Sequence, residues 1–309
     1  MSKYSKELEF AIEISKTALR ITEWFKAVGF ESFKKVDDTP VTLADLAAQI
    51  YIVSNLKTHF PDDQIISEED STYLSNQAEK LIKRSFEELN LNNSFNLKEI
   101  LNYNGKQVNR KWTIDPIDGT KGFQEDLYYA VGISLMEGSD RKISVITAPK
   151  FLDKGFTTFT AEKGNGAKVS YEGKEFIPIK VSDQNSLEEA TLVRSLHFDK
   201  EWVSKFAQVA NIKKFVRIDS MLKFCMVATG IADLYVKPVD MDHSYTWDYA
   251  PGDLLVSEAG GIISDLNNKP VNFNEEKFIC KTPGFSVDNC VLHRDIITNL
   301  EIIRFWDVN

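Results

Sequence analysis

The order of predicted elements changes near residue 184, and this change constrains the fold more than any other feature of the sequence. Before it, apolar stretches at 129–137 and 141–148 flank a Gly-Ser-Asp turn, which predicts paired antiparallel strands. After it, short strands alternate with helices, as in α/β structures. We therefore expect an α+β part with an antiparallel sheet over 1–184 and an α/β part over 185–309. The alternating segments are 190–194, 200–209, 214–218, 221–229 and 232–236.

Two helices are predicted before the first hairpin. Apolar residues recur at steps of three or four over 5–28, which places them on one face of an amphipathic helix. A polar turn over 34–39 separates it from a second helix. Thr42 stands at the N-cap position of that helix, and Asp45 follows three residues later, as in a capping box. A short strand over 64–67 comes next.

The composition limits the possible partners. The chain carries 37 basic and 46 acidic residues, a net charge of −9, and such a surface repels nucleic acids and anionic membranes. An acidic protein that acts on an anionic substrate needs bound cations, which invert the local field. Three cysteines without a CxxC spacing predict neither a disulfide framework nor a zinc site. With no signal-like or membrane-spanning stretch in view, we expect a cytoplasmic protein.

Acidic residues gather at the ends of predicted elements. Asp115 and Asp118 lie three residues apart at the end of a strand, with Gly119 permitting a sharp turn directly after them. Glu68 follows the strand at 64–67, and Asp248 begins a helix over 247–259. Carboxylate oxygens are the ligands that hard cations such as Mg²⁺ prefer. The pattern therefore indicates a magnesium site.

Each of these acids also has an ordinary structural explanation. Asp115 and Asp118 fit a polar turn, Glu68 fits a solvated charge run, and Asp248 fits an acid that favours a helix N-terminus. Asp45 fits a first-turn acid behind its cap. Accepting all of these explanations requires four acidic sites to lie at element ends by chance, so we favour the metal site.

Several segments together resemble the inositol monophosphatase superfamily of lithium-sensitive, metal-dependent phosphatases. Within it, the sequence is most similar to the 3′(2′),5′-bisphosphate nucleotidases, and the match in order and spacing covers nearly the whole chain. The resemblance implies a layered α-β-α-β-α sandwich with a metal site where its two parts meet. The segments are TPVTLAD (39–45), SEE (67–69), WTIDPIDGTKGF (112–123), IDSMLK (218–223), GIADLY (230–235), WDYAPG (247–252) and EAGG (258–261).

The resemblance also implies roles for the acidic residues. Glu68, Asp115 and the carbonyl of Ile117 are expected to hold one Mg²⁺, and Asp115, Asp118 and Asp248 a second. Glu68 is expected to touch a third, looser ion. Asp45 and Thr120 are expected to orient and deprotonate the attacking water.

Substrate contacts follow from the same resemblance. The backbone N–H groups of Gly119 and Thr120 are expected to hold the phosphate that is cleaved. A second set is expected to bind the rest of the substrate: Ser220 and Lys223 the other phosphate, Lys237 in a place where Arg is common, and His197 near the adenosine. The alternative without a substrate-binding role is that Lys223 and Lys237 are solvated surface residues and that His197 is a structural histidine.

The predicted function is hydrolysis of 3′-phosphoadenosine 5′-phosphate to AMP and phosphate, extending to the 5′-phosphosulfate analogue. One alternative keeps the chemistry with an inositol phosphate as substrate, as in inositol monophosphatase or inositol polyphosphate 1-phosphatase. Another is an inactive sensor that binds metal or nucleotide. The interpretation as a nucleotidase predicts a monomer that Li⁺ inhibits and that has no nucleic-acid or membrane partner.

Overall fold

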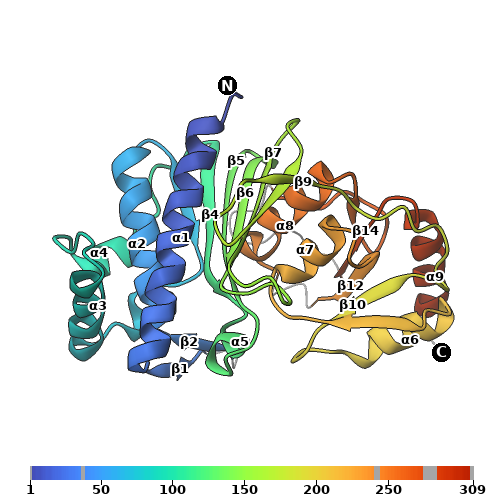
Figure 1. The fold of residues 1–309 in the computed structure, drawn as a ribbon, viewed down its shortest axis with the longest axis horizontal. Helices are drawn as coiled ribbons and strands as arrows, with labels where there is room; N and C mark the ends of the chain where they lie inside the picture. The colour runs from blue at the N-terminus through green and yellow to red at the C-terminus, as the bar shows by residue number, and fades with distance from the viewer. Residues whose placement is uncertain (1, 36–38, 240–243, 274–283, 307–309) are drawn as a thin grey trace.

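The computed structural model describes residues 2–35, 39–239, 244–273 and 284–306. Helices and sheets alternate in five layers across the molecule, as Figure 1 shows from the N-terminal helices to the C-terminal helix. This arrangement confirms the predicted α-β-α-β-α sandwich.

The first layer contains α1 (Ser5–Val28) and α2 (Leu43–His59), which agree with the two predicted helices. Between them the sequence predicted only a polar turn. The structure has two short strands there, β1 (Ser32–Lys34) and β2 (Pro40–Thr42), paired antiparallel. Strands of three residues are too short to show an alternating pattern.

A seven-stranded sheet forms the second layer, with its strands in the order β3-β4-β5-β6-β7-β8-β9. All neighbours pair antiparallel, as predicted, except β3 and β4, which run parallel at one edge. The strands are β3 (Gln64–Ser67), β4 (Arg110–Asp118), β5 (Ala130–Glu137), β6 (Asp140–Ala148), β7 (Thr157–Glu162), β8 (Ala167–Tyr171) and β9 (Ile177–Ile179). Shorter helices connect or flank them: η1 (Ser71–Tyr73), α3 (Asn76–Glu88), α4 (Leu97–Leu101) and α5 (Thr120–Gln124).

The end of β4 differs from the turn that the sequence suggested. The strand continues through Asp118, and its pairing with β5 shifts register between Asp115 and Asp118. Such an irregularity bends a strand and redirects its side chains. The Pro-Ile step between the two acids therefore lies inside a bulged strand end.

The second half supplies the remaining layers. A five-stranded sheet has the order β11-β10-β12-β14-β13, in which β10 runs parallel to both neighbours. Figure 1 shows α7 and α8 between the two sheets and α6 and α9 on the outer side. The elements are β10 (Thr191–Arg194), α6 (Glu201–Val209), β11 (Lys214–Arg217), α7 (Leu222–Ala228), β12 (Leu234–Pro238), α8 (Thr246–Glu258), β13 (Ile262–Asp265), β14 (Gly284–Asp288) and α9 (His293–Trp306).

The boundary predicted between 184 and 185 lies in the stretch from the end of β9 to the start of β10, and it stays a prediction. Within the described residues, no helix is both long and apolar enough to cross a membrane. Cys225 and Cys290 carry free thiols, while Cys280 falls outside the described ranges.

Candidate metal centre and active site

Acids from two distant stretches of the sequence meet where β4 and α8 approach each other. Asp115 and Asp118 come from the bulged end of β4, and Asp248 lies in the first turn of α8. Each offers a carboxylate oxygen, and these oxygens lie within 4.8 Å of one another. The structure therefore brings together these predicted metal ligands.

The cluster is electrostatically unfavourable without a cation. Burial raises the pKa of Asp115 and Asp248 well above the usual range, and the charges of neighbouring acids raise both further. Burial also raises the pKa of Asp118 to about 6, although nearby Lys223 and Lys237 oppose that shift. Asp115 is buried and Asp118 and Asp248 are partly buried. An oxygen-only set of like charges in such a place fits a hard divalent cation such as Mg²⁺.

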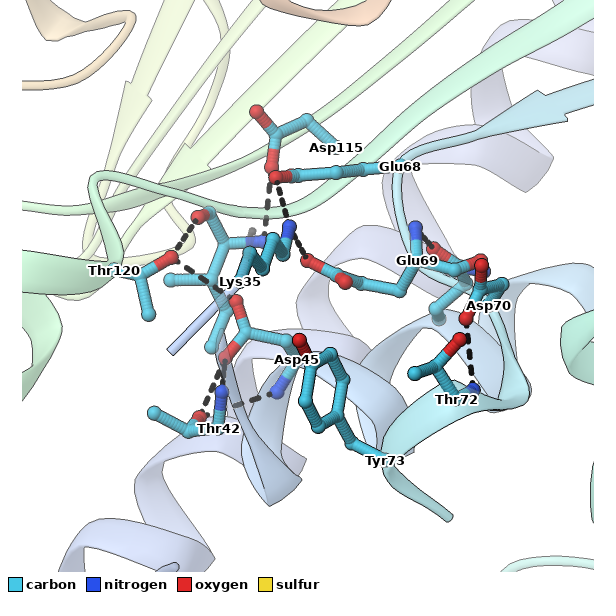
Figure 2. Close-up of polar contacts among 12 residues, drawn as sticks. Lys35, Thr42, Asp45, Glu68, Glu69, Asp70, Thr72, Tyr73, Asp115 and Thr120 are labelled. Carbon is cyan, nitrogen blue, oxygen red and sulfur yellow. Dashed lines mark hydrogen bonds and ion pairs between the residues drawn. The ribbon is translucent and has the colours of Figure 1, made fainter. Parts of the chain in front are cut away.

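Glu68, at the end of β3, has a partner that the sequence analysis missed. The ammonium of Lys35 lies 2.8 Å from Glu68 Oε1 and 2.6 Å from Glu69 Oε1. Figure 2 shows Lys35 beside the two glutamates. Burial lowers the pKa of Lys35, but the charges of the two glutamates outweigh it and raise the pKa overall. The structure thus places a lysine beside the predicted ligand.

Gln49 fixes this glutamate pair to α2. Its side-chain amide donates to the Glu69 carbonyl at 2.5 Å and accepts from the Glu69 N–H at 2.8 Å. The sequence shows only a glutamine among the apolar residues of the predicted helix, and the structure shows that it is fully buried, where a polar side chain needs hydrogen-bond partners.

Asp45 uses its two carboxylate oxygens for different contacts. Its Oδ2 accepts from the Thr42 N–H at 2.8 Å and the Thr42 hydroxyl at 2.5 Å, which completes the predicted capping box. Its Oδ1 accepts from the Thr120 hydroxyl at 3.2 Å, a contact drawn as a dashed line in Figure 2. Burial raises the pKa of Asp45 to about 7. The helix-cap and active-site explanations of this residue are therefore compatible.

The Thr120 hydroxyl has a second acceptor, the Ile117 carbonyl, also at 3.2 Å. A hydroxyl has one proton to donate, so Asp45 and Ile117 compete for it. The Ile117 carbonyl is the backbone ligand expected from the resemblance, and its position beside Thr120 links the predicted metal site to the predicted proton acceptor.

Gly119 brings the second half of the chain close to the metal cluster. Its φ is +92°, and a Cβ there would lie 3.1 Å from both Ser220 Cβ and the Tyr128 carbonyl oxygen. Ser220 itself adopts a φ of +64°, a strained value for a residue with a side chain. The next N–H, that of Met221, donates to Asp118.

The two predicted phosphate-binding lysines line the same cavity. The ammonium of Lys223 lies 5.7 Å from the centre of the Tyr235 ring. Burial lowers the pKa of Lys223. Lys237 donates to the Tyr249 hydroxyl at 3.0 Å. Their partly buried positions disagree with the alternative in which both are solvated surface residues.

His197 contacts a carboxylate through each ring nitrogen. Nδ1 pairs with Asp219, and Nε2 lies 2.8 Å from a Glu125 oxygen just after α5. Burial lowers the pKa of His197, but these two acids outweigh it and raise the pKa overall. The imidazole therefore joins the two halves at the cavity wall.

These features surround one cavity of about 1190 Å³. Every predicted site residue lines it except Asp45, which is fully buried behind Thr120. The predicted set that lines it is Glu68, Asp115, Ile117, Asp118, Gly119, Thr120, His197, Ser220, Lys223, Lys237 and Asp248.

Residues 3–302 match the inositol monophosphatase family, and the chain belongs to that family. Curated relatives carry a narrower name. A 3′(2′),5′-bisphosphate nucleotidase from Dictyostelium discoideum is 32% identical, with 84% of this chain and 83% of the relative covered. A 3′(2′),5′-bisphosphate nucleotidase 1 from Candida albicans is 30% identical, covering 87% and 88%. Among solved structures, a Thermotoga maritima IMPase has a TM-score of 0.71 at 23% identity over 96% of this chain and 98% of that one.

Proposed function

We propose that this protein is a magnesium-dependent 3′(2′),5′-bisphosphate nucleotidase that converts 3′-phosphoadenosine 5′-phosphate to AMP and phosphate. The observation that carries the proposal is the partly buried acidic cluster in the wall of a cavity that Lys223 and Lys237 also line. A substrate with two phosphates needs one set of groups at the reacting phosphate and a separate set of cations at the other. The relatives' names support a 3′(2′),5′-bisphosphate nucleotide as the substrate.

The acidic residues divide between two ion positions in this proposal. Glu68, Asp115 and the Ile117 carbonyl would hold one Mg²⁺, and Asp115, Asp118 and Asp248 the other, with a third looser ion at Glu68. Bound Mg²⁺ supplies Lewis-acid activation of water and neutralises charge on the leaving oxygen.

Proton transfer falls to Thr120 and Asp45. A hydroxyl is a poor base alone, but the Thr120 Oγ1 can accept a proton from water while it passes its own to Asp45 at 3.2 Å. Asp45 is suited to receive it because its pKa lies near neutrality. The Thr42 contacts hold the carboxylate so that the other oxygen faces Thr120.

The remaining groups orient the substrate. The N–H groups of Gly119 and Thr120 hold the phosphate that is cleaved. Ser220, Lys223 and Lys237 bind the 5′-phosphate, which does not react. Lys237 provides a point charge where an arginine would provide a bidentate fork, so it attracts the phosphate without fixing its orientation.

Phosphate release from 3′-phosphoadenosine 5′-phosphate and from inositol 1-phosphate, each with Mg²⁺ and with EDTA, tests the proposal. We expect a large kcat/KM preference for the nucleotide that EDTA abolishes, and selective loss of nucleotide turnover in Ser220→Ala and Lys223→Ala. Preference for the inositol ester would favour the alternative substrate class, and no turnover of either would favour the sensor. Addition of Li⁺ and size-exclusion chromatography test the proposed inhibition and monomer.

A further inference from the structure

The wall of the cavity contains an exposed aromatic side chain that the proposed chemistry does not use. Of the eight large apolar side chains exposed in the described part of the chain, Phe198 is the most exposed, at 66%, and it alone lines the cavity. An open aromatic face at a ligand cavity is costly to leave in water and available for a ligand.

Phe198 lies between the two halves of the site. It follows β10 in the α/β part, while the ammonium of Lys121, from α5 in the other part, lies 6.0 Å from the centre of its ring. A cation near an aromatic face and a nearby phosphate site together suit an anionic ligand that carries a flat ring.

Two polar side chains beside Phe198, those of Ser195 and His197, are already engaged. The Ser195 hydroxyl donates to Asp219 and accepts from the Phe198 N–H at 3.2 Å. Both nitrogens of His197 contact carboxylates. These groups therefore have little capacity left to read the hydrogen-bonding edge of a base.

We infer that Phe198 provides the stacking surface for the heteroaromatic base of the substrate, and that this segment selects for the presence of a base and only weakly for its identity. The inference rests on the proposed nucleotidase function. Stacking is tolerant of base identity because every base has a π face, whereas an inositol ring has none. The substrate class is accordingly nucleoside bisphosphates in general.

Competitive inhibition by AMP and by ribose 5-phosphate measures the contribution of the base, because ribose 5-phosphate has the same sugar and phosphate with a C1 hydroxyl in place of the base. The ratio of their inhibition constants is measured in the wild type and in Phe198→Leu, Phe198→Tyr and Phe215→Leu. Phe215 is the matched control, since it is an aromatic residue with 44% exposure that does not line the cavity.

We expect the wild type to bind AMP more tightly than ribose 5-phosphate and Phe198→Leu to reduce that ratio at least about fivefold, the low end for a base–aromatic contact. Phe198→Tyr and Phe215→Leu should keep the wild-type ratio. Guanosine 3′,5′-bisphosphate should be turned over with a KM within about tenfold of that for the adenosine substrate. Stacking on Phe198 without hydrogen bonds to the edge of the base distinguishes guanine from adenine only weakly.

An unchanged ratio in a folded Phe198→Leu variant, checked by its melting temperature, overturns the inference. So does a wild-type ratio near unity, or an equal loss in Phe215→Leu. Failure of the proposed function looks different: the wild type then fails to prefer 3′-phosphoadenosine 5′-phosphate over inositol 1-phosphate, whatever the variants do.

Discussion

Replacing Asp45 with Asn should abolish most of the activity while stabilising the metal-free fold. The substitution keeps the size of the side chain and an oxygen that can accept from Thr42. It removes the charge that would receive the proton from Thr120. Loss of a positioned proton acceptor lowers kcat by about 10²–10⁴.

The effect on stability follows from the pKa. Burial raises the pKa of Asp45 from 3.8 to about 7, so between these values the unfolded chain binds fewer protons than the folded chain. The folded state therefore loses stability as the pH rises through this range, and the loss is complete above the folded pKa. At about 1.4 kcal/mol per pKa unit, the loss is about 4 kcal/mol. The asparagine carries no charge, so the Asp45→Asn variant avoids this loss of stability. Its net gain is smaller than about 4 kcal/mol because the neutral amide oxygen accepts weaker hydrogen bonds from Thr42.

Two assays separate these effects. Phosphate release with Mg²⁺ gives kcat, and urea unfolding in EDTA above the Asp45 pKa gives the free energy of unfolding. Asp295→Asn is the matched control, because Asp295 is an exposed first-turn acid of α9 outside the cavity. Near wild-type kcat in Asp45→Asn would refute the proton-transfer role, and a less stable variant would refute the electrostatic reasoning.

Three further perturbations test the site. Asp115→Asn should remove the rise in melting temperature that Mg²⁺ produces, since a ligand stabilises only the fold that binds it, and should raise the melting temperature in EDTA; a retained Mg²⁺ response contradicts the metal assignment. Lys35→Gln should lower the free energy of unfolding in EDTA by about 3 kcal/mol, the cost of leaving a buried acid unpaired; urea titration would reveal an unchanged midpoint if the contact is unimportant. Gly119→Ala should cost at least about 1 kcal/mol and reduce kcat, because its φ is positive and its Cβ would press on Ser220; an equally stable, fully active variant excludes that close approach.

The local elements were largely predictable from the sequence. The helix over 5–28 has the predicted bounds, and the cap at Thr42 is present, because periodicity and capping depend on residues within one or two turns. The pairing of β1 with β2 was not predicted, because strands of three residues are too short to show the alternation of apolar and polar residues that indicates a strand. Only the structure shows that the stretch over 74–104 contains α3 and α4.

For the candidate site, the sequence determined which acids stand at element ends and, through the resemblance, which residues to expect around them. Only the tertiary structure decided that Lys35 bridges Glu68 and Glu69, that both nitrogens of His197 are engaged, and that Phe198 remains open to the cavity. Chain-local patterns set where an element ends. Contacts between distant segments depend on how the two sheets and their helices pack, which no local pattern records.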